Sequence, residues 1–83
     1  MQDKYLKNLT KQLLALKTET EMESFLRALF TPQELEYIPK RLEIIRLLKK
    51  GVPQHTIARN LDLGVATVTR GSRELKANHF KNV

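Results

Sequence analysis

The sequence predicts an all-α fold of about five helices, and three observations lead to this prediction. Apolar residues recur at steps of three and four along most of the chain, which is the periodicity of one helical face. No segment of strand length alternates between apolar and polar residues. The 83 residues include only three Gly and three Pro, so there are few points at which helices are interrupted.

The length and composition fit one small domain that spans residues 1–83. A chain this short buries only about 60–65% of its unfolded surface, which favours a homodimer that buries more. Because the chain has no Cys, disulfides, thiolate zinc sites and Cys nucleophiles are excluded. No apolar run approaches the roughly 18 residues that span a bilayer, and no signal peptide opens the chain. We therefore expect a cytoplasmic protein that does not contact membranes.

The positive charge is concentrated in the second half of the chain. The formal net charge is +6. Residues 39–76 contain nine Lys and Arg against three Asp and Glu, whereas residues 1–38 contain five against six. A local excess of this size favours contact with a polyanion, although a solvated helical surface could have the same composition.

Two helices are expected in the first thirty residues. Leucines spaced by three, four and three residues predict a helix over 4–17 with an apolar stripe formed by Leu6, Leu9, Leu13 and Leu16. Thr20 and Glu23 have the spacing of a capping box, which predicts that a second helix begins there. Together with a third helix, these segments are expected to form a core and dimerisation part over residues 1–50.

The third helix has the strongest start signal. Thr31 stands at the N-cap, Pro32 at the first helical position and Glu34 at the third, and Gly51 ends the helix. Its apolar side consists of Leu35, Ile38, Leu42, Ile45 and Leu48. Pro39 lacks the N–H that would continue the helical hydrogen bonds, so a kink or a break is expected there.

Residues 53–76 have the pattern of a helix-turn-helix, in which two short helices are joined by a tight turn. Ala58 is small, as the closest approach of two steeply crossing helices requires. Apolar residues fall where the wedge between the helices must be filled: Ile57, Leu61, Leu63 and Val68. The turn needs a positive φ, and Asp62 stands there in place of the usual Gly. Gly64 is expected to share that role.

When the wedge residues point inward, small, hydroxyl and basic residues remain on the outer face of the last helix, at about 65–76. Small and hydroxyl side chains can approach base edges closely, and arginines can reach guanine or phosphate. The predicted DNA-binding residues are Gln54, Val65, Ala66, Thr67, Thr69, Arg70 and Arg73. Lys49, Lys50 and Arg59 could neutralise flanking phosphates. The alternative is an ordinary two-helix corner with a polar outer face.

The segment VATVTRGSRELK (residues 65–76) resembles the recognition helix of the Trp repressor family, whose signature has the form IATITRGSN-LK. The segment LFTPQELEYIPKRLEIIRLL (residues 29–48) is similar to the helix pair that precedes it. The resemblance covers roughly residues 20–76. It implies an interlaced all-α homodimer that places two recognition helices in successive major grooves of a palindromic operator in double-stranded DNA.

The resemblance also implies that L-tryptophan is the corepressor and binds between the recognition helix and the dimer core. The residues that match the family's pocket are Thr31, Arg41, Ile44, Arg70 and Gly71. A guanidinium group can pair with the carboxylate of the amino acid through two hydrogen bonds and stack on its indole ring. Arg41 could instead form a salt bridge with Glu34, Glu36 or Glu43, and Arg70 could contact phosphate alone.

The chain departs from the family pattern at three places. Glu74 stands where the family often has a small polar residue near the ligand's ammonium group; its carboxylate could pair with that group or point to solvent. The stretch between Ile45 and Gln54 is slightly shorter, as in orphan Trp-repressor-like proteins. Only ANHFKNV follows the recognition helix. The family's last helix is therefore expected to be missing, and the dimer interface to lie in the first 48 residues.

The leading hypothesis is a sequence-specific, DNA-binding transcriptional repressor that uses L-tryptophan as corepressor to control tryptophan-related genes. The alternatives are an orphan helix-turn-helix regulator without a ligand and a helical protein-interaction module. Catalysis and a metal site are not expected. His55 and His79 lie far apart without metal-ligand spacing, and the three Gly are too scattered to form a phosphate-binding loop.

Overall fold

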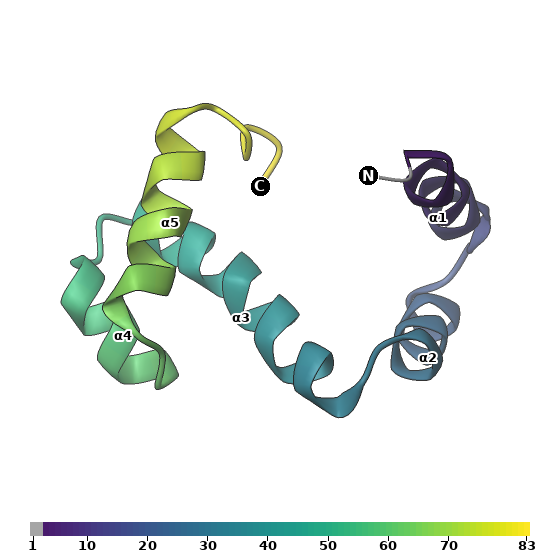
Figure 1. Ribbon diagram of the computed structural model, residues 1–83, viewed down its shortest axis with the longest axis horizontal. Coiled ribbons are helices and arrows are strands. Elements are labelled where there is room, and N and C mark those ends of the chain that lie inside the picture. Colours follow the sequence, from purple (N-terminus) through teal and green to yellow (C-terminus); the bar gives the residue numbers. More distant parts are fainter. Residues whose placement is uncertain (1–2) are drawn as a thin grey trace. The chain divides into compact units, whose positions relative to one another are not determined.

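The computed structural model describes residues 3–83 and consists of five α-helices joined by short loops (Figure 1). The helices are α1 (Asp3–Ala15), α2 (Glu19–Leu29), α3 (Pro32–Lys49), α4 (Gln54–Leu61) and α5 (Val65–Lys76). Residues 3–83 form no strand, which confirms the predicted all-α class. Within the same residues, no helix combines the length and the apolarity needed to cross a membrane.

Contacts divide the chain into two compact units, Met1–Leu35 and Glu36–Val83. The first unit contains α1, α2 and the first turn of α3. The second contains the rest of α3, α4, α5 and a tail over residues 77–83. That the chain forms a single domain stays a prediction.

The apolar side chains of the first unit are only partly covered: Leu9, Leu13 and Leu16 of the predicted stripe are half-buried, and Leu6 is exposed. Among the residues described, neither α1 nor α2 contains a buried residue. Leu6 is 57% exposed and Leu14 is 81% exposed. Helices of this length are marginal in water without tertiary packing, so α1 and α2 need a further surface against which to bury these side chains.

The start of α2 differs from the prediction. The N-cap is Thr18 and not Thr20, because the Thr18 hydroxyl accepts a hydrogen bond from the N–H of Glu21 at 3.0 Å. In return, the Glu21 carboxylate accepts one from the N–H of Lys17 at 3.2 Å. Two overlapping Thr-x-x-Glu pairs have the same capping-box spacing, and the earlier pair begins the helix.

The start and end of α3 agree with the prediction. The Thr31 hydroxyl accepts a hydrogen bond from the Glu34 N–H at 3.2 Å, and the Glu34 carboxylate accepts one from the Thr31 N–H at 2.9 Å. Gly51 follows the helix with a φ of +85°. The expected break at Pro39 is wrong, because α3 runs through it without interruption. Pro39 is exposed, so water can satisfy the carbonyl that its missing N–H leaves unpaired.

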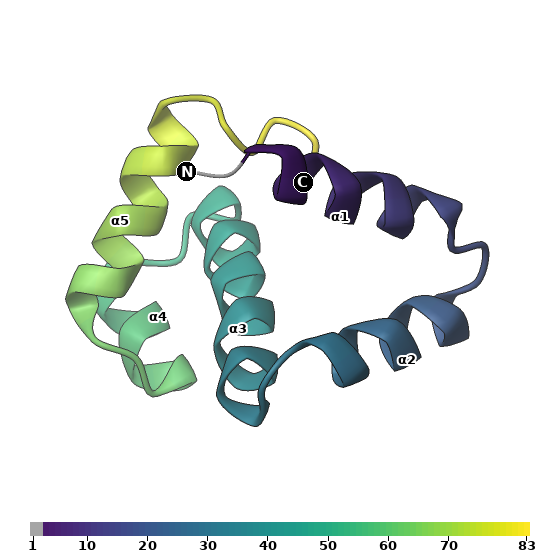
Figure 2. The same ribbon diagram turned by 45° about the vertical axis from the view of Figure 1, so that its right-hand side comes forward.

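The core of the second unit lies between the C-terminal half of α3 and the α4–α5 pair (Figure 2). Its buried residues are Ile44, Ile57, Ala58 and Val68, with Leu47, Leu48, Val52, Leu61 and Leu63 packed around them. Ile57 and Val68 are fully buried, and Leu61 and Leu63 are half-buried. The wedge predicted from the sequence is therefore confirmed, and it determines which face of α5 remains outside.

The turn between α4 and α5 depends on Asp62. This residue adopts the left-handed conformation, with φ 54° and ψ 52°, as predicted, and its N–H bonds to the carbonyls of Ala58 and Arg59. Gly64 does not share the role, because its φ is −69° and it serves as the N-cap of α5. Asp62 is thus the residue of this turn that carries the left-handed backbone conformation.

We expect Asp62→Gly to raise the free energy of unfolding by about 1 kcal/mol, because Gly adopts the left-handed conformation without the steric cost of a Cβ. Asp62→Ala should lower it, since Ala tolerates this conformation less well than Asp. Urea denaturation of the unaltered protein and the two variants, all at one fixed protein concentration, measures both effects. Equal stability of the Gly and Ala variants would contradict the assignment.

Candidate functional site

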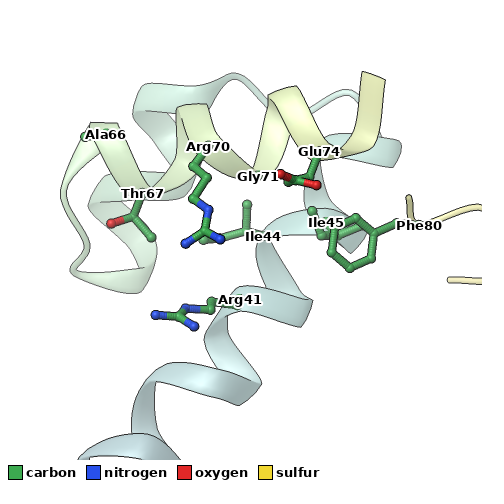
Figure 3. A pocket seen from close by; sticks show the side chains of 9 residues that line it. All are labelled: Arg41, Ile44, Ile45, Ala66, Thr67, Arg70, Gly71, Glu74 and Phe80. Carbon is green, nitrogen blue, oxygen red and sulfur yellow. The ribbon is translucent and has the colours of Figure 1, made fainter. Parts of the chain in front are cut away.

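A pocket of about 450 Å³ lies between α3 and α5 in the second unit (Figure 3). The lining residues are Arg41, Ile44, Ile45, Ala66, Thr67, Arg70, Gly71, Glu74 and Phe80. Five of these are apolar and four carry a charge or a hydroxyl group. A mostly apolar wall with a few polar groups, at this volume, is typical of a small-molecule site.

Two arginines face the same end of the pocket from different helices. Figure 3 shows the guanidinium of Arg41, from α3, and that of Arg70, from α5, extending toward one side of the pocket. Within residues 3–83 neither side chain forms an ion pair, so the alternative of a salt bridge from Arg41 is not observed. Glu36 pairs instead with Lys40 at 3.4 Å. This end of the pocket is therefore suited to an anionic group.

Gly71 allows α5 to approach α3 closely. A Cβ placed on it would lie 2.9 Å from Cγ2 of Ile44 and 3.4 Å from Cδ1 of Ile45. Both isoleucines are only 1% exposed, and side chains packed this tightly cannot move aside without strain. The residue that precedes Gly71 is Arg70, so the same close approach positions the guanidinium of Arg70 on the side of the pocket that Arg41 also faces.

Glu74 supplies the one acidic group of the pocket. Its carboxylate contacts the imidazole of His79, which follows in the tail. The hydrogen bond from His79 is the main cause that holds the pKa of Glu74 below its ordinary value. Desolvation acts in the opposite direction, and the positive charges of His79, Arg70 and Arg73 lower the pKa further. The carboxylate is thus an anion that could pair with an ammonium group.

The predicted DNA-binding residues lie along α5 and at the start of α4. Four of them are exposed, namely Val65, Ala66, Arg70 and Arg73, and three are half-buried, namely Gln54, Thr67 and Thr69. The hydroxyl of Thr69 donates a hydrogen bond to Oε1 of Gln54 at 2.9 Å. This bond links the two helices of the helix-turn-helix, and Val65 and Ala66 at the start of α5 remain exposed.

The structure brings five of the six predicted ligand-binding residues together around the pocket: Arg41, Ile44, Arg70, Gly71 and Glu74. Thr31 belongs to the first unit, where its hydroxyl caps α3, and its role at a ligand stays a prediction. Sequence reasoning missed Ile45 and Phe80 as lining residues, and it assigned Ala66 and Thr67 to DNA contact alone. Apart from Phe80, no Phe, Tyr or Trp follows Tyr37 in the sequence. An isolated aromatic side chain in a polar tail is the signal that could have found it.

The buried wedge between α4 and α5, the left-handed turn and the exposed face of α5 define a helix-turn-helix protein. The family model described as "Trp repressor protein" matches residues 4–82. The chain therefore belongs to the Trp repressor family. Members of this family are DNA-binding regulators and not enzymes, which agrees with the prediction that catalysis is absent.

Similar relatives are named "Trp operon repressor homolog". The protein from Actinobacillus succinogenes is 46% identical over 59 residues, which is 70% of this chain and 58% of that protein. The protein from Vibrio vulnificus strain YJ016 is 42% identical over 59 residues, with the same coverage of 70% and 58%. The protein from Mannheimia succiniciproducens is 46% identical over 55 residues, which is 65% of this chain and 54% of that protein. The chain thus spans little more than half the length of these relatives. No solved structure gives a significant match.

We expect Gly71→Ser to lower the free energy of unfolding by about 1–3 kcal/mol, because its side chain would overpack the contact with Ile44. Gly64→Ser is the matched control. No atom lies within 4 Å of a Cβ at Gly64, and Ser is favoured at an N-cap. Thermal unfolding of both variants measures the difference. An equal loss in both would show that the close approach at Gly71 is not the constraint.

Proposed function

We propose that this chain is a sequence-specific DNA-binding transcriptional repressor that acts in the cytoplasm as a homodimer and uses L-tryptophan as corepressor to control tryptophan-related genes. One observation carries the proposal: Arg41 and Arg70, without acidic partners in the described part of the chain, face one pocket between α3 and α5. The two helices have different roles: α3 contributes to the core, and α5 presents the outer face of the helix-turn-helix.

Recognition of DNA would use the N-terminal part of α5. Val65 is 54% exposed and Ala66 is exposed, and small side chains here allow the helix to enter a major groove closely. Arg73 is exposed further along the helix, and Arg59 is exposed on α4. Arginines at these positions can neutralise phosphates on either side of the groove, which gives affinity and fixes the orientation of the protein.

The pocket offers a complementary group for each part of a zwitterionic amino acid. The guanidinium groups of Arg41 and Arg70 can pair with the carboxylate through charge-assisted hydrogen bonds. The carboxylate of Glu74 can pair with the ammonium group. The side chains of Ile44 and Ile45 provide apolar contact for an aromatic side chain, and a volume of about 450 Å³ leaves room for one.

Ligand binding would affect DNA binding because the pocket includes part of the DNA-facing turn. Ala66 and Thr67, in the first turn of α5, line the pocket together with Arg41 of α3. A ligand that contacts both helices stabilises the orientation of α5 in which all these contacts are made. If that orientation is also the one that fits the groove, ligand and DNA strengthen each other's binding to the same extent.

Exposed apolar side chains support the proposed homodimer. Leu29 in α2 is 50% exposed, and Leu42 in α3 is 43% exposed. With Leu6 and Leu14 of α1, these residues provide apolar surface that a second copy could bury. A chain of this length benefits from such burial because its own core is small.

We expect the protein to select one duplex from a random-sequence pool and to bind it about 10³-fold or more tighter than a scrambled duplex of the same composition. Affinity should fall steeply as salt increases, because several phosphates are neutralised. Millimolar L-tryptophan should tighten specific binding by about 5- to 150-fold. Fluorescence anisotropy with a labelled duplex measures all three effects. Unchanged affinity with L-tryptophan would point to an orphan regulator, and equal weak binding to every sequence would refute the DNA-binding function.

We expect Arg41→Ala and Arg70→Ala each to weaken L-tryptophan binding by about tenfold or more, because each removes a charge-assisted hydrogen bond to the carboxylate. Arg46→Ala is the matched control: Arg46 is an exposed arginine of α3 that does not line the pocket. Isothermal titration calorimetry without DNA measures the affinities of the three variants and of the unaltered protein. Equal losses at Arg46 and Arg41 would indicate a general charge effect and contradict the assigned carboxylate site.

A further inference from the structure

The tail that follows α5 returns to the pocket and places an aromatic side chain in its wall. The backbone turns at Asn78, which has a φ of 66°, and two residues later Phe80 lines the pocket with Ile45. Figure 3 shows the ring of Phe80 beside Ile45 and near Glu74. Phe80 is half-buried, whereas the residues on both sides of it are exposed.

Contacts from two helices hold the tail in this position. The ammonium group of Lys49, at the end of α3, donates hydrogen bonds to the carbonyl oxygens of Phe80 at 2.6 Å and Val83 at 2.8 Å. The N–H of His79 bonds to the Glu74 carbonyl at 3.2 Å, and the His79 imidazole contacts the Glu74 carboxylate. Phe80 therefore lies between an attachment to α3 and an attachment to α5.

The position of the ring gives the pocket two chemically different ends. Arg41 and Arg70 lie toward one end, and the ring of Phe80 lies toward the other, against the buried side chain of Ile45 and near the carboxylate of Glu74. A ligand whose carboxylate pairs with the arginines would direct its remaining part along the apolar wall toward Phe80. Aromatic side chains prefer offset or edge-to-face contact with another aromatic ring, which an aliphatic side chain cannot reproduce.

We propose that Phe80 is a specificity-determining residue of this pocket, whose ring selects a ligand with a carboxylate at one end and an aromatic side chain at the other. The inference rests on the proposed function, since it concerns the ligand that the regulator binds. It adds a residue from the tail, outside the helix-turn-helix and outside the residues predicted to bind the ligand. The chain's own tail thus determines part of the ligand preference.

The test compares L-tryptophan with L-leucine, which shares the carboxylate and ammonium groups but has an aliphatic side chain. Calorimetry should give tighter binding of L-tryptophan to the unaltered protein. Phe80→Leu keeps an apolar side chain but removes the ring, so the ratio of the two dissociation constants should fall by about three- to tenfold. Lys81→Ala changes an exposed residue of the same tail and should leave that ratio unchanged.

Each outcome has a separate meaning. If the unaltered protein binds neither amino acid at millimolar concentration while it still binds DNA, the corepressor function fails and this inference fails with it. If it binds L-tryptophan but Phe80→Leu leaves the ratio unchanged, only the inference is overturned. Far-UV circular dichroism shows whether the variants are folded.

A second measurement needs no ligand. Because the chain contains no Trp, Phe80→Trp introduces a single indole at the pocket, and Lys81→Trp introduces one at an exposed neighbour. We expect fluorescence from position 80 to be shifted to the blue and to be quenched less by acrylamide than fluorescence from position 81. Equal quenching at the two positions would show that residue 80 is not part of the pocket wall, and it would overturn the inference.

Discussion

The contact of Gly71 with Ile44 and Ile45 determines the geometry of the second unit. Ile44 also packs with Ile57 and Val68, so the residue that sets the distance between α3 and α5 belongs to the core of the helix-turn-helix. The pocket lies beside this contact, with Ile44, Ile45 and Gly71 in its wall. Any change in how α5 packs on α3 therefore changes the core, the pocket and the orientation of the outer face together.

The two units place their apolar residues differently. In Glu36–Val83, five hydrophobic side chains are less than a tenth exposed, whereas the described residues of α1 and α2 include no buried side chain and leave their apolar residues half-buried or exposed. The second unit can therefore hold the helix-turn-helix and the pocket by its own packing. The first unit derives its helices from local signals, such as the capping boxes at Thr18 and Thr31, and depends on further burial for tertiary stability.

Features that depend on neighbours in sequence could be predicted from the sequence, and features that depend on distant contacts could not. The Thr31–Glu34 capping box and the left-handed Asp62 are local, and both are confirmed. The predicted start of α2 lies two residues too late because two overlapping Thr-x-x-Glu pairs satisfy the same local rule. Phe80 could not be placed, since its position depends on Lys49, 31 residues earlier in the chain. Nor does spacing reveal that Gln54 and Thr69 bind each other.

The carboxylate of Glu74 links ligand recognition to the tail. Its contact with His79 helps to hold the tail segment that carries Phe80, and the same carboxylate is available at the pocket for an ammonium group. An amino acid that pairs with Arg41 and Arg70 through its carboxylate would bring its ammonium group into competition with His79 for Glu74. A stronger contact between His79 and Glu74 would therefore weaken the binding of a ligand's ammonium group to the same carboxylate. In the proposed complex, a ligand without an ammonium group would leave the His79 contact intact, and the hydrogen bonds from Lys49 to Phe80 and Val83 would hold the tail with either kind of ligand.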